Sequence, residues 1–326
     1  MISTPIAAVP FEPAPPVAPA LVLEPTPARP IPSSGRTVET DFSTWLRQHA
    51  WSIPRPVMHG SELHYETEGA SGRFSVVIGQ KRAEWNGWQL LLGFEPRVVA
   101  GRVWLHPLDV QDHVEPLLGG TLWQPSNHTI VLDPGHGGRS PGSRSIAGNQ
   151  FEKDFTLDWA LRLRRLLEAR GWTVWLTRTN DLEMSLTERV DFAEATGAAV
   201  FVSLHFNSSF PNLQAAGLET YSLTPQGMAS HVVREYPDEV GRAFPNNAHD
   251  ADNLRIAARI HQAIVEATGE TDRGIRHARF MDVLRWQNRP AILIEGGYLS
   301  NPAEARQIQS PAFRQRLADG VAAGLP

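Results

Sequence analysis

The sequence predicts an α/β fold, with a sheet sandwiched by helices, preceded by a small β-rich domain. From Thr129 onward, apolar strand-like runs such as TIVLD and AVFVSLH alternate with longer helix-like segments. Before that point, short β runs are joined by two-residue turn signals such as Asn86-Gly87. The 326 residues, 41% hydrophobic and 20% charged, are enough for one large domain and a smaller one.

The first part of the chain is predicted to contain a linker and then the β-rich domain. Residues 1–36 hold ten of the 26 prolines and end in Pro-Ser-Ser-Gly, which is typical of an extended spacer. In residues 37–122, a helix-like stretch (42–51) precedes β runs at 73–79, 82–93 and 97–106. Five tryptophans in this domain favour core filling, although a sugar-stacking face is the alternative: Trp45, Trp51, Trp85, Trp88 and Trp104.

Residues 126–326 are predicted to form the larger domain. Helices are expected where apolar residues recur at helical spacing, at 151–171, 185–197, 252–269 and the last 16 residues. Ser185 and Glu188 form a capping box, and Gly171 ends the first helix. Buried strands are expected at 129–133, 173–177, 199–205, 218–223 and 291–295.

Four polar residues stand at the ends of these elements. His136 follows the first strand, His205 and Glu295 end two later ones, and Glu152 opens a helix. Residues at the carboxyl ends of strands in an open α/β sheet can meet in one crevice. Two imidazoles and a carboxylate are typical of catalytic zinc, which keeps a fourth position for water. The chain has no cysteine, which excludes thiolate ligands, so we expect one Zn²⁺ per chain.

Each of these residues also has a structural interpretation. A single strand-end histidine is more often a hydrogen-bonded structural residue. The spacing from Asn149 to Glu152 fits a capping box, and Glu295 before two glycines could be a turn residue. Together the four favour a metal site, because buried polar groups need partners that the neighbouring loops do not supply.

A competing pattern, G-x-S-x-G, spans residues 138–142 and is typical of the nucleophile elbow in serine hydrolases. The residue after that serine must donate its backbone N–H to the oxyanion hole. Pro141 has no N–H, and the next helix begins about ten residues too late. The pattern therefore does not favour a serine hydrolase.

The motifs DPGHGG, SLHFNSS and ILIEGGYLSN, with the early Glu152, resemble the third family of zinc-dependent N-acetylmuramoyl-L-alanine amidases. The resemblance covers about residues 128–326. It implies a peptidoglycan hydrolase that cleaves the amide between N-acetylmuramic acid and L-alanine. Residues 38–120 show a weaker resemblance to the N-terminal domain of copper amine oxidases.

By this resemblance His136, Glu152 and His205 correspond to the zinc ligands, and Glu295 to the catalytic glutamate. Asp133 is expected to orient the His136 loop. We add Asn207 and Arg285 as candidates for substrate binding, since amide and guanidinium groups match peptide and carboxylate acceptors. The alternatives are a zinc peptidase or deacetylase with the same ligand set, and a non-catalytic wall-binding regulator.

The chain departs from the family pattern in two places. Ser140 stands where the family's first loop usually has an acidic residue, which puts the local loop contacts in doubt. A long insert runs from about Thr224 to Ala251, where some relatives carry an inhibitory helix. Pro237 and Pro245 break this insert, which favours a wall of the substrate groove over a plug.

Charge and hydropathy limit the partners and the location. A net charge of -5 argues against nucleic acid as a partner. No stretch of 18 apolar residues predicts a membrane span. The first residues lack Lys and Arg, and prolines interrupt their apolar stretch, which makes a poor signal peptide. We therefore expect the periplasm or cell envelope from the substrate alone, and the sequence identifies no activator protein.

Overall fold

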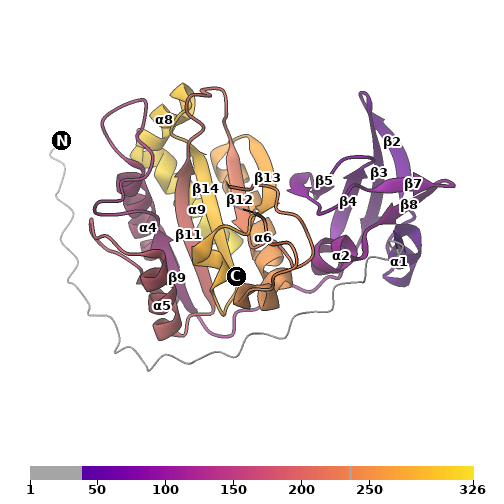
Figure 1. Ribbon diagram of the computed structural model, residues 1–326, viewed down its shortest axis with the longest axis horizontal. Helices are drawn as coiled ribbons and strands as arrows, with labels where there is room; N and C mark the ends of the chain where they lie inside the picture. Colours follow the sequence, from indigo (N-terminus) through magenta and orange to yellow (C-terminus); the bar gives the residue numbers. More distant parts are fainter. Residues whose placement is uncertain (1–38, 235–236) are drawn as a thin grey trace.

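The computed structural model describes residues 39–234 and 237–326, so the predicted linker at 1–36 lies outside the described residues. A sheet of eleven strands runs through the described part of the chain (Figure 1). In chain order its strands are β2 (Arg55–His59), β3 (Glu62–Gly69), β4 (Gly72–Val77), β5 (Arg82–Trp85), β6 (Trp88–Leu91), β9 (Thr129–Pro134), β10 (Thr173–Leu176), β11 (Val200–Asn207), β12 (Leu218–Ser222), β13 (Asp272–His277) and β14 (Ala291–Tyr298). Their spatial order is β10-β9-β11-β14-β12-β13-β6-β5-β4-β3-β2.

Helices and a small second sheet complete the described fold. The helices are α1 (Phe42–Gln48), α2 (Pro107–Asp109), the π-helical turn η1 (Val110–Val114), α3 (Glu115–Leu118), α4 (Glu152–Glu168), α5 (Leu186–Thr196), the 3₁₀ turn η2 (Pro245–His249), α6 (Asp250–Thr268), α7 (Asp282–Arg285), α8 (Pro302–Gln309) and α9 (Pro311–Gly324). The second sheet has the order β1 (Thr40–Asp41), β8 (Arg102–Leu105), β7 (Arg97–Val99).

The C-terminal part is the predicted sandwich of helices around a sheet. Strands β10, β9, β11 and β14 are parallel neighbours, and their central residues are fully buried. Helices α4, α6 and α9 pack together on one face and share a core with the sheet that includes Trp159. Helices α5 and α7 cover the opposite face over a smaller core that includes Phe201. The carboxyl ends of the parallel strands are therefore brought to one edge.

The β-rich part is continuous with this sheet. Strand β6 pairs with β13 at Leu90 and Ile275, and one hydrophobic core contains residues from both parts. Trp45 and Trp51 are buried in that core and Trp85 packs against it, which confirms the core-filling interpretation for these residues. The division at residues 37–122 and 126–326 stays a prediction.

Local turn chemistry was predicted well, and several short elements were missed. The β5–β6 turn has Asn86 and Gly87 at φ 55° and 87°, as the Asn-Gly signal predicts. Ser185 and Glu188 form the expected capping box. Strands β2 and β3 and the short helices between 107 and 118 were not predicted, because they lack strong periodicity.

The shared core predicts that both parts unfold together. Leu90 is 1% exposed at the junction of β6 and β13. Leu90→Ala should lower the free energy of unfolding by about 2 to 5 kcal/mol, because it removes buried methyl groups and leaves a cavity. Tryptophan fluorescence and far-ultraviolet circular dichroism should report one coincident transition in both proteins. Two separate transitions in the unaltered chain would contradict a shared core.

Candidate metal centre and active site

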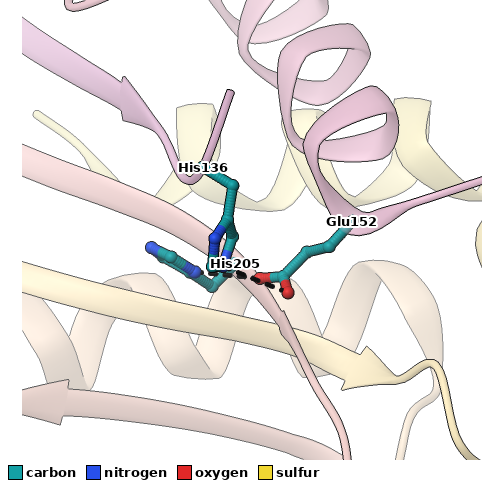
Figure 2. A group of neighbouring side chains, drawn as sticks. All are labelled: His136, Glu152 and His205. Carbon is teal, nitrogen blue, oxygen red and sulfur yellow. Dashed lines mark hydrogen bonds and ion pairs between the residues drawn. The ribbon is translucent and has the colours of Figure 1, made fainter. Parts of the chain in front are cut away.

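A buried carboxylate lies between two imidazole rings at the edge formed by the parallel strands. The two carboxylate oxygens of Glu152 contact different rings: Oε1 lies 2.9 Å from Nδ1 of His205, and Oε2 lies 3.2 Å from Nε2 of His136. Figure 2 shows the three side chains, which come from the loop after β9, the start of α4 and strand β11, pointing toward one another. One ligand atom from each of His136, Glu152 and His205 lies within 4.8 Å of the others. These three residues form a metal group, because they can together hold a metal ion.

The backbone fixes the carboxylate in place. Its Oε1 accepts the N–H of Phe206 at 3.1 Å, and its Oε2 accepts the N–H of Ser143 at 2.9 Å. Burial opposes the charged form of Glu152, but hydrogen bonds from His136 and His205 outweigh it and hold the pKa far below its usual value. The carboxylate is therefore an oriented anion, which suits a metal ion. Its side chain is 4% exposed, whereas His136 and His205 are 27% and 18% exposed, so the imidazole side faces solvent.

Two glycines make room for this arrangement. A Cβ on Gly135 would lie 2.2 Å from the ring of His205. A Cβ on Gly142 would lie 2.6 Å from Oε2 of Glu152 and 2.7 Å from the His136 ring. His136 itself has a left-handed backbone with φ 64°, which is unfavourable for a residue with a side chain. The glycine-rich loop is thus needed for close packing around the imidazoles.

Asp133 supports this loop indirectly, as expected. Its carboxylate is buried and accepts hydrogen bonds from Thr177, Ser203 and Arg189, at 2.6, 2.7 and 2.5 Å. Arg189 in turn donates to the backbone oxygen of His136 at 2.7 Å. Burial opposes ionisation of Asp133, but the charge of Arg189 outweighs it and lowers the pKa. Asp133 therefore acts on the loop and does not face the metal group.

A second arginine that the sequence analysis missed joins the loop to helix α4. Arg178 is buried and donates to the backbone oxygens of Pro134, Gly135 and Lys153, at 3.0, 2.9 and 2.8 Å. Burial, with the nearby charge of Arg189, lowers the pKa of Arg178 to about 10, so it stays charged at neutral pH. An isolated arginine after a strand gives no local signal for this role.

Glu295 lies beside the metal group. It pairs with His205 in the parallel register of β11 and β14. Its Oε2 is buried and has no hydrogen-bond partner among the described residues. Burial, together with the carboxylates of Glu152 and Glu219, raises the pKa of Glu295 well above its usual value. An unpartnered buried carboxylate next to a metal group is a suitable proton acceptor and donor.

The candidate substrate residues have different surroundings. Asn207 is on the same strand as His205 and donates from Nδ2 to Glu219 at 2.9 Å. Arg285 is on α7, where it pairs with Asp282 and lies over the Phe244 ring. Asn207 therefore lies at the sheet edge near Glu295, whereas Arg285 lies on the helix α7 that covers one face of the sheet. Their role in substrate binding stays a prediction.

The insert after β12 also reaches this region. Arg234 lies over the Phe280 ring at 4.7 Å. Burial raises the pKa of Glu295, and the charge of Arg234 offsets only part of this rise. In the described residues between 224 and 249 the insert contains no helix except the short turn η2. Its function as a groove wall stays a prediction.

The strand ends predicted at His205 and Glu295, and the structural alternatives for Glu295 and Asn149, need correction. His205 and Glu295 lie within β11 and β14, because parallel pairing continues past them to Asn207 and Tyr298, so Glu295 is not a turn residue. Asn149 does not cap α4: it accepts from Arg144, and the helix is capped through Asp154, whose carboxylate accepts the N–H of Phe151.

The contacts of Ser140 also remove the elbow interpretation. Its Oγ lies 3.1 Å from Nδ1 of His136, in a tight turn that is bridged by Gly137 and Ser140. No helix follows until Glu152. The hydroxyl therefore orients the ring of His136 and leaves Nε2 facing Glu152.

The comparisons agree with this geometry. Residues 130–326 match the family model described as N-acetylmuramoyl-L-alanine amidase, which is more than half of the chain. The chain belongs to this amidase family. The predicted family resemblance and the predicted α/β fold are therefore confirmed.

Named relatives of the amidase family lie at moderate identity. AmiC of Neisseria meningitidis is 30% identical over 276 residues, covering 72% of this chain and 65% of the relative. The sporulation-specific amidase of Bacillus subtilis is 36% identical over 199 residues, covering 60% and 66%. The chain thus spans just under two thirds of the length of these two relatives.

Solved structures of amidases show the same fold. An amidase from Clostridium difficile 630 is 32% identical with a TM-score of 0.50, covering 60% of this chain and 94% of that one. The catalytic domain of CwlV from Bacillus (Paenibacillus) polymyxa is 35% identical with a TM-score of 0.50, covering 61% and 96%. No helix in the described ranges is long and apolar enough to cross a membrane.

The packing around Glu152 predicts that Gly142→Ala weakens metal binding. The added Cβ would displace the carboxylate of Glu152 or the ring of His136, at a position with φ 70°. We expect the affinity for Zn²⁺, measured by competition with a chelator, to fall at least about tenfold. Gly171→Ala is the matched control, because Gly171 has φ 84° but nothing within 4 Å of an added Cβ. Equal affinities in both variants would contradict the packing argument.

The buried pair of Asp133 and Arg189 predicts a pH dependence of stability. Folding lowers the pKa of Asp133. Its contribution to the free energy of unfolding is therefore fully present above the unfolded-state pKa of about 3.9, and it is lost as pH falls through the lower pKa of the folded state. Asp133→Asn should lower the free energy of unfolding by about 3 to 5 kcal/mol at pH 7. The difference in stability between the variant and the unaltered protein should become smaller below about pH 4. Asp191→Asn, at an exposed site on α5, is the control. If this stability difference is the same at pH 7 and below pH 4, the assignment of Asp133 and Arg189 as a stabilising ion pair is wrong.

Proposed function

We propose that this chain is an N-acetylmuramoyl-L-alanine amidase that hydrolyses the amide bond between N-acetylmuramic acid and L-alanine in peptidoglycan. The carrying observation is the buried Glu152 carboxylate between two imidazoles, with the unpartnered carboxylate of Glu295 on the neighbouring strand. Membership of the amidase family selects this activity over a zinc peptidase or deacetylase with the same ligand set.

We assign one Zn²⁺ per chain to His136, Glu152 and His205. Two imidazoles and a carboxylate are a catalytic zinc set, and their ligand atoms lie within 4.8 Å of one another. Zinc bound there would supply a Lewis acid that activates a water and polarises the substrate carbonyl. The backbone N–H groups of Phe206 and Ser143 hold Glu152 in position, so the ligand set needs no rearrangement before it binds the ion.

Glu295 transfers the proton in this proposal. Its free Oε2 accepts a proton from the attacking water and passes it to the alanine nitrogen, which must be protonated to leave as an amine. Burial raises the pKa of Glu295, and a raised pKa makes the ionised carboxylate a stronger base. The buried surroundings of Glu295 therefore suit a general base that becomes a general acid.

Substrate residues and location complete the proposal. We assign Asn207, which donates a hydrogen bond to Glu219, to orienting a substrate amide, and Arg285, which lines a pocket together with Arg234, to binding a substrate carboxylate. Because peptidoglycan lies outside the cytoplasmic membrane, we assign the protein to the periplasm or cell envelope. A regulator that only binds the wall would hold zinc without turnover.

Glu295→Gln tests the proton-transfer assignment. The variant should keep Zn²⁺, but its kcat should fall by a factor of about 10² to 10⁴, because the side-chain amide of glutamine cannot accept a proton from the water. The measurement is release of the alanyl amine from a muramoyl peptide, together with zinc content by mass spectrometry of the native protein.

His136→Ala is the matched comparison. This variant should lose both zinc and turnover, because it removes a ligand. Full activity in Glu295→Gln would show that another group is the base. Unaltered protein that holds zinc but cleaves none of the amide would favour the regulator.

A further inference from the structure

A second charged cluster lies next to Glu295 on the same face of the sheet. Glu219 on β12 pairs with Glu295 on β14 and is 2% exposed. It accepts from Nε of Arg273 at 2.8 Å, and Nη2 of Arg276 lies 3.4 Å away. Both arginines belong to β13, the next strand of the sheet.

This cluster carries surplus positive charge. One carboxylate neutralises only one of two guanidinium groups, and the remaining contacts of Glu219 are neutral donors: Asn207, Tyr221 and Tyr298. The side chains of Arg273 and Arg276 are 31% and 21% exposed, so an anion can reach them. Arg273 also stacks over the ring of Tyr298 at 5.3 Å, which holds its planar group in one orientation.

The register places this cluster at a defined distance from the metal group. His205, Glu295 and Glu219 are paired residues on three neighbouring strands, so their side chains share one face. Two strand spacings of about 4.8 Å put Glu219 about 10 Å from the strand of His205. An extended peptide advances about 3.5 Å per residue, so this span matches about three residues.

We propose that Arg273 and Arg276, anchored by Glu219, form a subsite that binds a carboxylate of the second or third residue of the stem peptide. The inference rests on the proposed function. On the glycan side, the lactyl carboxyl of muramic acid is consumed in the scissile amide, so free carboxylates belong to the peptide side. Guanidinium groups bind carboxylates with charge-assisted hydrogen bonds.

The subsite also sets the direction of the substrate. The peptide runs from the metal group across β14 and β12 toward β13, and the glycan lies on the side of β9 and β10. Arg276 is the better probe of the pair, because its contact with Glu219 is the longer one. Its loss removes a hydrogen bond to the backbone oxygen of Arg273 at 3.1 Å but leaves the ion pair of Arg273 with Glu219.

The test uses the full chain and three synthetic muramoyl tripeptides. They differ only in whether a free carboxylate stands at the second residue, at the third, or at neither because both are amides. The unaltered protein should show a KM about tenfold lower for one carboxylate substrate than for the fully amidated one. Arg276→Gln should raise that KM about tenfold and leave kcat and the KM of the amidated substrate unchanged.

Controls separate binding from structural effects. Arg276→Lys should restore part of the preference for the carboxylate substrate. If Arg276→Gln does not fold, Arg273→Gln removes the other guanidinium group of the pair and provides the same test. Arg55→Gln removes the same charge from an exposed site on β2, at the far edge of the sheet, and should change none of the KM values. Equal KM values for all three substrates in the unaltered protein, or an equal rise in all three with Arg276→Gln, would overturn the subsite. If the unaltered protein releases no alanyl amine from any substrate, the proposed function fails together with it.

Discussion

The contact of the buried Glu152 carboxylate with two imidazoles is the interaction on which the other features depend. Burying a carboxylate is unfavourable unless it is paired and hydrogen-bonded, and here two ring nitrogens and two backbone N–H groups do so. The close approach requires glycine at positions 135 and 142 and a left-handed backbone at His136. Folding therefore already desolvates and orients the anion that we propose as a zinc ligand.

The sheet then distributes the chemistry along one face. Parallel pairing of β11 with β14 puts Glu295 beside His205, and antiparallel pairing of β14 with β12 puts Glu219 beside Glu295. In our proposal, β11 carries a metal ligand and β14 a proton-transfer carboxylate, while Glu219 on β12 anchors the cationic pair of β13. The same sheet continues through β6 into the β-rich part, so a single core stabilises both the site and the N-terminal strands.

Sequence alone predicted the parts of this arrangement that rest on local patterns. Apolar strands followed by small residues located His136, His205 and Glu295, and the resemblance assigned their roles. The supports could not be predicted, because they depend on non-local contacts. Arg178 and Arg189 reach the loop from 40 or more residues away in sequence. The spacing from Asn149 to Glu152 was misleading, because a capping box is inferred from local sequence alone. In the structure α4 begins at Glu152, with Phe151 as its N-cap, and Asn149 lies in the preceding loop.

The most direct test of the central claim is mass spectrometry of purified peptidoglycan after incubation with the protein, with and without a zinc chelator. The account predicts stem peptides with free L-alanine amino termini, lost with the chelator and restored by added Zn²⁺. Cleavage at a different bond, or the same products in the presence of the chelator, would contradict a zinc amidase built on Glu152.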